Sequence, residues 1–344
     1  MVRVVLAVHG WYHPASQDDR YSEYMARSLQ SAGIQFEKLE GWKLPHGRFS
    51  QLVFSTTLRY VLDYVDRNGV IHDLFGDSVF KNLDVATIHD LYWNTPQIGM
   101  MPRALQVVQL IYQDYWRTLK RAKKVIVTSK FTRDQIGKYY GQEYLAKLVE
   151  IPIPCAPEKE FKKQSTQYDV IWIGSNLRRK SLLEFLKVIG SLPKQFRVAI
   201  IAKKVSGIVG EDPRTIRDLV QALNADGHSV SFIERRLTDD ELDDLYRNSK
   251  CLVSSSTYEG FHSPVSEAYL RGTHIVLPLS PIYSCQYSNE DGVHWYRDRE
   301  EMRDRILNAV EYGHFSPSCE IARKLSYANV GKLLKATYED VSRF

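Results

Sequence analysis

Two glutamates, Glu259 and Glu267, accompany a predicted strand-to-helix turn and are the first candidates for chemistry in this sequence. The helix is well signalled, because Ser263 suits the N-cap, Pro264 the first helical position and Gly272 the position that ends it. Its first-turn N–H groups suit a phosphate or sugar hydroxyls, so both carboxylates can face one ligand. Each also has a plain structural explanation: Glu267 can stabilise the helix dipole, and Glu259 can be a solvated turn residue.

A basic turn, Arg-Arg-Lys at 178–180, follows a predicted strand at 168–173. Cations at a helix N-terminus oppose the helix dipole, and a bound anion would remove that conflict. Fixed cations or a metal ion could hold such an anion. No metal is expected, because no apolar strand ends in an isolated Asp-x-Asp. The acidic residues of the predicted helix at 238–247 are expected to face solvent: Asp239, Asp240, Asp243 and Asp244.

Length and composition indicate a globular protein of about two domains, since 344 residues carry 44% hydrophobic and 25% charged side chains. The net charge of +5 suits anionic ligands and is too small to indicate nucleic-acid binding. The apolar run before His9 is shorter than a signal segment, and no window reaches the roughly 18 apolar residues of a spanning helix. Widely spaced cysteines indicate reduced thiols in a cytoplasmic protein: Cys155, Cys251, Cys285 and Cys319.

Short apolar runs alternate with helical patterns along the chain, which predicts two parallel α/β sheets. In the first half, strands are expected at 2–8, 85–88, 125–128 and 148–151, with helices at 18–31, 49–67, 103–121 and 132–140. Three prolines between Ile151 and Pro157 favour a linker. The expected domains are 1–152, a linker at 153–167, and 168–320, with a C-terminal helix at 321–344 that returns to the first domain. Two Rossmann-like domains would then face a central cleft.

Tyr258-Glu-Gly-Phe-His-Ser-Pro-Val-Ser-Glu-Ala268 resembles the E-x7-E segment of retaining glycosyltransferases of the GT-B fold, family 4 in particular. Segments at 125–133, 168–174 and 237–251 resemble the same group in the same order, so the similarity covers about residues 84 to 277. The resemblance implies an α/β GT-B fold and transfer of a sugar from a nucleotide-diphosphate donor.

The resemblance also implies roles for single residues. Glu259 would contact the donor sugar, Glu267 the ribose hydroxyls, and Lys180 the diphosphate. Ser175 stands where the family has an arginine, so Arg178 or Arg179 would supply the second cation. His262 replaces a glycine and is expected to narrow or re-aim the sugar pocket. The remaining expected donor contacts are Gly174, Gly260, Phe261, Ser263, Pro264 and Val265.

His89 follows a strand of the first domain and resembles the family histidine that approaches the sugar, through its side chain or its backbone carbonyl. A packed structural histidine is the alternative. The loop after the first strand stands where the family has a glycine-rich turn, and its aromatic residues suit an acceptor sugar, although they could simply pack together. Its residues are His9, Gly10, Trp11, Tyr12 and His13.

The sequence as a whole predicts a retaining, metal-independent hexosyltransferase-type glycosyltransferase without a cofactor. Its donor would be a UDP- or GDP-type sugar, and its acceptor a glycan, a glycolipid or a small molecule with a hydroxyl. Nucleic acid is not an expected partner. The basic end of the helix at 103–121 could touch a membrane surface weakly, but a solvated helix end is favoured. A catalytically silent nucleotide- or glycan-binding protein and a nucleotide-sugar epimerase remain the alternatives.

Overall fold

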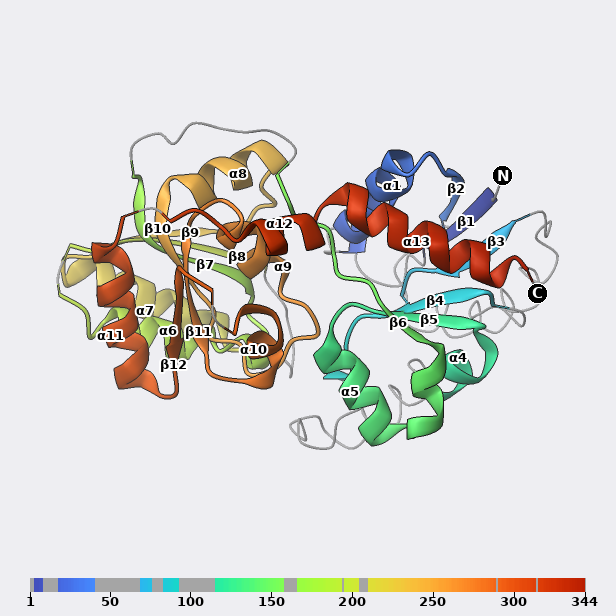
Figure 1. Cartoon of the computed structure of the whole chain (residues 1–344). Helices are drawn as coiled ribbons and strands as arrows, with labels where there is room; N and C mark the ends of the chain where they lie inside the picture. Colours follow the sequence, from blue (N-terminus) through green and yellow to red (C-terminus); the bar gives the residue numbers. More distant parts are fainter. Residues whose placement is uncertain are drawn as a thin grey trace. The chain divides into compact units, whose positions relative to one another are not determined.

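The computed structural model describes residues 3–8, 18–40, 69–75, 83–92, 115–157, 166–193, 195–203, 210–288, 290–313 and 315–343. The chain divides into two compact units (Figure 1), one made of Met1–Pro154 with Lys324–Phe344 and the other of Cys155–Arg323. The expected helix at 49–67 and most of the one at 103–121 lie outside the described residues. Each unit is built on its own parallel sheet.

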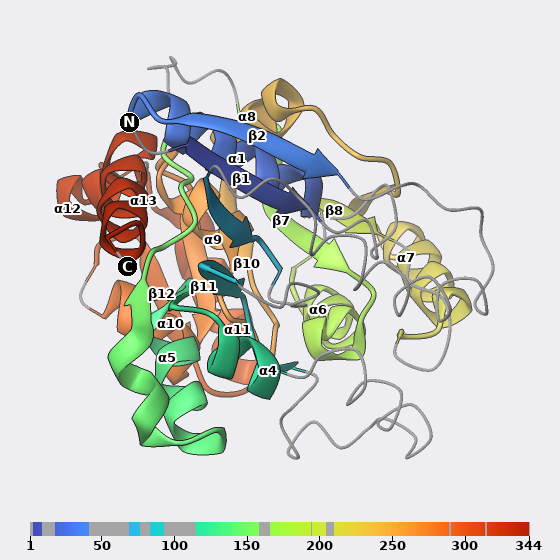
Figure 2. The same ribbon diagram turned by 90° about the vertical axis from the view of Figure 1, so that its right-hand side faces the viewer.

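The sheet of the first unit has the strand order β2-β1-β3-β4-β5-β6, and all its pairings are parallel. Figure 2 shows β1 and β2 side by side. The sequence did not predict β2 and β3, because β2 is a largely polar edge strand and only two of the four residues of β3 are apolar. The strands are β1 (Arg3–Val8), β2 (Gln35–Glu40), β3 (Val70–Asp73), β4 (Val85–Ile88), β5 (Lys124–Val127) and β6 (Leu148–Glu150).

Helices α4 (Tyr115–Arg121) and α5 (Lys130–Tyr139) share a hydrophobic core with the strands of the first sheet. Ser129 caps α5, since its side chain accepts from Thr132 N. A 3-10 turn, η4 (Gln142–Lys147), follows α5 and brings Lys147 to the end of α4, where Nζ donates to the carbonyls of Leu119 and Ala122. A lysine thereby satisfies carbonyl groups that the helix leaves without partners.

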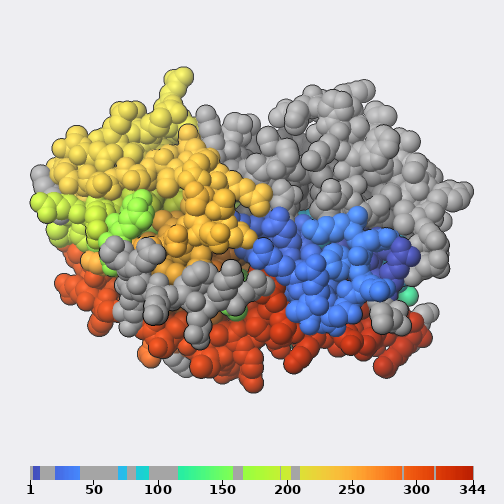
Figure 3. Space-filling view, turned by 90° about the horizontal axis from the view of Figure 1, so that it is seen from above, coloured from blue at the N-terminus to red at the C-terminus, as the bar shows by residue number. Residues whose placement is uncertain are grey.

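The last segment of the chain is helical as expected but is interrupted, so it forms α12 (Cys319–Lys324) and α13 (Tyr327–Val341). Ser326 starts the second helix, because its side chain accepts from Asn329 N. Helix α13 packs on α1 (Asp18–Ser31), and the two surfaces adjoin in Figure 3. The contact requires glycine at Gly331, where a Cβ would come within 2.2 Å of the Ser28 carbonyl oxygen.

A chain of buried polar side chains anchors α13 to the sheet of the first unit. His72 on β3 is fully buried, with Nδ1 2.7 Å from the Tyr338 hydroxyl and Nε2 2.9 Å from the Thr87 hydroxyl. The Thr87 hydroxyl lies 3.3 Å from the Tyr21 hydroxyl. Burial, helped by the charge of nearby His89, lowers the pKa of His72 to about 3, so the ring is neutral near pH 7.

The sheet of the second unit has the strand order β12-β11-β10-β7-β8-β9, again with parallel pairings. The chain adds β8 and β9 on one side of β7 and β10 to β12 on the other, so the strand order reverses between β7 and β10. Ligands of open α/β sheets bind at such a switch point, outside the carboxyl ends of the strands. The strands are β7 (Tyr168–Ser175), β8 (Arg197–Lys203), β9 (Ser229–Ile233), β10 (Ser249–Val253), β11 (His274–Pro278) and β12 (Val293–Tyr296).

Helices α6 (Leu182–Ile189), α7 (Pro213–Ala225) and α11 (Arg299–Glu311) share one hydrophobic core with the strands of this sheet. Helix α8 (Asp239–Arg247) packs against α9 (Ser263–Tyr269), and both contact β10. Thr238 and Glu241 form a capping box at the start of α8, which confirms the start predicted for that helix. Helix α10 (Pro281–Tyr287) is joined to α9 by a hydrogen bond of 2.7 Å between the Tyr287 and Ser266 hydroxyls. No helix of the described ranges has the length and apolarity needed to cross a membrane.

Replacing Tyr338 with Phe should lower the free energy of unfolding by about 1–3 kcal/mol, because a buried nitrogen of His72 would lose its partner. Chemical denaturation measures this change. Tyr327→Phe on the same helix is the matched control, since Tyr327 lies outside the His72 network and is half-buried. Equal losses in the two variants would contradict a special contribution of the His72 contact.

Candidate functional site

The candidate site lies in the second unit, where β7 and β10 end at the switch point. The loop after β7 carries the basic turn at 178–180, now seen as a 3-10 turn, η5 (Arg178–Lys180). The loop after β10, residues 254–262, carries Glu259. Ser181 follows the basic turn in the left-handed conformation, φ 52°, and turns the chain directly into α6.

Hydrogen bonds join these two loops over their length. The Ser255 hydroxyl donates to the Lys180 carbonyl at 2.7 Å, and Thr257 N donates to the Arg179 carbonyl at 2.8 Å. In return, Arg179 Nη1 donates to the Tyr258 carbonyl at 2.7 Å. Backbone contacts therefore fix the spacing between the basic turn and the loop that carries Glu259.

Glu259 lies buried between two cations. Its Oε1 is 2.5 Å from Lys180 Nζ, and its Oε2 is 2.7 Å from Arg179 Nη1. The side chains of Glu259 and Lys180 are only 6% and 5% exposed. Burial alone would raise the pKa of Glu259, but the Arg179 and Lys180 charges outweigh it and hold that pKa well below its usual range. The cluster thus carries one excess positive charge, which is electrostatically suited to an anionic ligand.

The structure separates the two candidate arginines of the basic turn. Arg179 reaches Glu259 beside Lys180, whereas Arg178 turns away and its Nε lies 3.4 Å from the Gly210 carbonyl. Ser175, which stands where the family has an arginine, ends β7 and pairs with Lys203 of β8. Arg179 is therefore the residue whose position suits a second cation.

Trp172 contacts the loop after β10 and helps to hold both loops. The sequence did not predict this role. Its indole Nε1 donates to the Ser255 hydroxyl at 3.0 Å, and that hydroxyl donates to the Lys180 carbonyl. The ring also explains Gly174, because a Cβ there would lie 2.9 Å from the indole. An apolar strand pattern predicts that Trp172 is buried, but it carries no signal for this hydrogen bond.

His262 turns into the interior of the unit. Only 7% of the residue is exposed. Its φ of −97° is an unstrained conformation for histidine, so the position does not require the glycine that the family has there. Nδ1 lies 3.2 Å from the Ser254 hydroxyl and 3.0 Å from the Tyr283 hydroxyl. The ring thus meets two buried hydroxyls. That His262 narrows or re-aims the sugar pocket stays a prediction.

Helix α9 begins at Ser263, with His262 at the N-cap position and no capping bond from a side chain, so Ser263 is not the N-cap that the sequence predicted. Val265 N already donates to the His262 carbonyl at 3.0 Å, and Pro264 has no N–H. Neither residue offers a backbone donor to a ligand. Gly272 has φ 72°, as the predicted end of the helix requires.

Glu267 is 6% exposed, and its Oε2 accepts from the Tyr246 hydroxyl at 2.7 Å. The Arg271 guanidinium lies over the Tyr246 ring and forms a short ion pair with Asp243. Asp243 is 7% exposed and also pairs with Arg247, so its expected solvent-facing position was wrong. The spacing in α8 places Asp243 on the side that packs against α9, where its charge needs these partners.

The Glu211 carboxylate contacts the first turn of α6, close to the basic turn. No pattern in the sequence predicted this position. Its Oε2 accepts from Leu183 N at 3.1 Å, while Ser181 provides no capping bond. Asn176 holds Glu211 in place, because its Nδ2 donates to the Glu211 carbonyl at 2.9 Å. Burial raises the pKa of Glu211 to about 7, and the backbone N–H of Leu183 acts in the opposite direction.

His89 lies in the first unit, where β4 ends. Its Nε2 is 2.9 Å from the Leu74 carbonyl, and its ring packs edge-on against Tyr21. Its own carbonyl accepts from the hydroxyls of Thr128 and Thr132, each at 3.2 Å. These two bonds use the carbonyl lone pairs, so any contact with a ligand would come from the ring.

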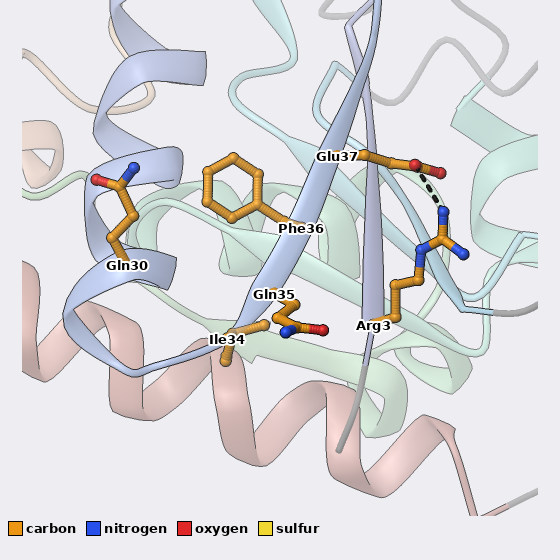
Figure 4. Close-up of a pocket in the computed structure, with 6 residues that line it drawn as sticks. All are labelled: Arg3, Gln30, Ile34, Gln35, Phe36 and Glu37. Carbon is orange, nitrogen blue, oxygen red and sulfur yellow. Dashed lines mark hydrogen bonds and ion pairs between the residues drawn. The ribbon is translucent and has the colours of Figure 1, made fainter.

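The loop His9 to His13 lies outside the described residues. A hollow in the first unit is lined by residues of α1, β1 and β2; Figure 4 shows Phe36 on the side of β2 that faces α1 and the Arg3–Glu37 ion pair on the other side of the strand. None of the predicted site residues lines this hollow. In the ranges that the structure describes, no three His, Cys, Asp or Glu side chains are grouped as a metal site.

Glu211 should make the stability of the second unit depend on pH. A carboxyl whose pKa rises from 4.5 to about 7 on folding stabilises the fold below pH 4.5, and this contribution is lost as the pH rises through 7. The difference in free energy of unfolding between the wild type and Glu211→Gln should therefore shrink or reverse between pH 5 and 8. Denaturant titrations at several pH values measure it, and a constant difference would contradict the assignment.

A comparison with family models finds a match within the second unit. Residues 157–305 match the family model described as glycosyl transferases group 1. The chain is 26% identical over 254 residues to the GtfA subunit of the UDP-N-acetylglucosamine–peptide N-acetylglucosaminyltransferase of Streptococcus parasanguinis. That match covers 68% of this chain and 46% of the relative, so the chain spans about half the length of the curated protein.

Solved structures share the fold over the whole chain. Sucrose-phosphate synthase of Thermosynechococcus elongatus superposes with a TM-score of 0.69 at 16% identity, covering 100% of this chain and 97% of that one. An E. coli trehalose-6-phosphate structure bound with UDP-2-fluoro glucose gives 0.66 at 10% identity, covering 99% of both chains. HepE of Anabaena, in complex with UDP and glucose, gives 0.62 at 12% identity, covering 100% and 98%. The expected two-sheet α/β fold is thus confirmed, and residues 157–305 are similar to the glycosyl transferases group 1.

Proposed function

We propose that this protein is a retaining, metal-independent glycosyltransferase that moves a sugar from a nucleotide-diphosphate donor to an acceptor hydroxyl. The observation that carries the proposal is the buried cluster of Lys180, Arg179 and Glu259 at the switch point of the second sheet. Its excess positive charge suits a diphosphate, and its position is where open α/β sheets bind nucleotides.

In the proposed reaction, the bond between the anomeric carbon and the diphosphate oxygen breaks, and the acceptor oxygen bonds to the same carbon. The departing diphosphate takes the proton of the acceptor hydroxyl, so attack from the same face retains the configuration. Lys180 and Arg179 stabilise the negative charge that develops on the diphosphate, and thereby supply the charge that a metal ion provides elsewhere.

Glu259 stays ionised at neutral pH and is proposed to orient the donor sugar. Glu267 is proposed to accept from the ribose hydroxyls, with Tyr246 holding its carboxylate in place. A UDP-type donor is favoured, because two of the structural neighbours are described with UDP or a UDP-sugar. Roles for His89 and for the loop His9 to His13 remain predictions.

The position of Arg179 weakens the alternative of a catalytically silent binding protein. That alternative rested on Ser175, which stands where the family has an arginine, and on the altered loop His9 to His13, which lies outside the described residues. Arg179 places a guanidinium beside Lys180 from a neighbouring turn, so a second cation is present at the cluster.

Lys180→Met should lower kcat by about 100-fold, because it removes a fixed charge from the departing diphosphate. Arg178→Met is the matched control in the same turn, and its kcat should change little since its side chain points away from the cluster. Transfer kinetics measure both, and thermal unfolding shows how far the loss of the ion pair with Glu259 also destabilises Lys180→Met. Equal effects in both variants would contradict the assignment of Lys180.

Calorimetric titrations with UDP, GDP, ADP and their sugar conjugates should identify one nucleotide that binds equally well with and without EDTA. Glu267→Gln should weaken that binding by roughly ten-fold, because a charged hydrogen bond to the ribose is lost. Donor hydrolysis or transfer with the best binder then tests turnover. Absence of binding by every nucleotide would refute the proposed donor site, and binding without turnover would favour the silent protein.

A further inference from the structure

Three buried side chains, Ser254, His262 and Tyr283, meet behind the charged cluster of the site. The Ser254 and Tyr283 hydroxyls lie 2.7 Å apart, and both lie within 3.2 Å of His262 Nδ1. Ser254 directly follows β10, His262 is the N-cap of α9 and Tyr283 lies in the first turn of α10, and none is more than 7% exposed. Three separate elements are therefore joined at one point.

Ser254 and His262 are the two ends of the loop that carries Glu259. Tyr283 contacts both, so its hydroxyl closes the base of the loop. The middle of the loop is held from the other side by its bonds to the basic turn. Glu259 is thus fixed between two anchors, one made by Lys180 and Arg179 and one made by Tyr283.

The charged side chains of the first anchor also change the pKa of His262 in the second. Burial and then the Lys180 ammonium lower the pKa of His262 to about 3, and Arg179 acts in the same direction. Glu259 and the Ile173 carbonyl act in the opposite direction. The ring is therefore neutral near pH 7, and its Nδ1 can accept from one of the two hydroxyls while the other hydroxyl donates to its neighbour. A protonated ring would place a further cation beside Lys180.

We infer that Tyr283 is a positioning residue, which together with His262 and Ser254 holds the 254–262 loop so that Glu259 stays aligned with Lys180. The inference rests on the proposed function for its catalytic consequence, but the hydrogen-bond geometry stands without it. It also gives a role to the histidine that replaces a family glycine: His262 and Tyr283 act as a pair at the base of the loop.

The test compares Tyr283→Phe with Tyr287→Phe in the full chain. Tyr287 is the matched control, because it lies on the same helix, is equally buried, and bonds Ser266 at 2.7 Å as Tyr283 bonds Ser254. Tyr283→Phe should lower kcat roughly three- to ten-fold, with a smaller change in the KM for the donor. Tyr287→Phe should leave both constants near the wild-type values, even if its thermal stability falls.

A second measurement separates positioning from a general loss of structure. NMR of protein labelled in the histidine rings, with the His262 signal assigned through His262→Gln, follows the titration of that ring. Loss of the Tyr283 hydroxyl should raise the pKa of His262, and the acidic limb of the kcat profile should move upward with it. Tyr287→Phe should move neither.

Equal loss of kcat in the two tyrosine variants, or an unchanged His262 titration in Tyr283→Phe, would overturn the inference. A wild-type protein that binds no nucleotide and transfers no sugar would refute the proposed function instead. The NMR titration would still decide whether Tyr283 controls His262, so the two failures are distinguishable.

Discussion

The pairing of the buried Glu259 carboxylate with Lys180 and Arg179 is the constraint on which the second unit depends. A charge removed from water is costly unless it is paired, and loss of one partner leaves the other charge buried without compensation. The loop after β10 and the turn after β7 must therefore stay in register to within a hydrogen-bond length. The bonds of Ser255 and Thr257 to the basic turn provide that register.

The topology of the sheet makes this pairing possible. Strands β7 and β10 are neighbours although their loops lie about 80 residues apart in the chain, as the separation of Arg179 and Glu259 shows. Both loops leave the carboxyl ends of parallel strands, so their side chains meet at one edge. Trp172 adds a rigid support beneath this edge and restricts position 174 to glycine.

The first unit also buries polar side chains, but those of the His72 network are neutral. His72 is buried and uncharged, and it joins Tyr338 of the last helix to Thr87 of the sheet. The arrangement needs no counter-charge, because neutral polar groups only require hydrogen-bond partners when they are buried. His89 lies next to this network, with its ring against Tyr21. The side chains that anchor α13 and those that position His89 thus belong to one packed region.

Local signals in the sequence determined the alternation of strands and helices, the capping box at Thr238 and the segments that form the site. These features depend on the backbone and on side chains a few residues away. The polar edge strand β2 and the short β3 escaped prediction, because their apolar patterns are too weak. Only the tertiary structure decided that Arg179 joins Lys180 while Arg178 turns away, that Asp243 is buried, and that His262 points inward. Each of these outcomes depends on which distant element lies within a few ångströms of a side chain, and the folded sheet sets that distance.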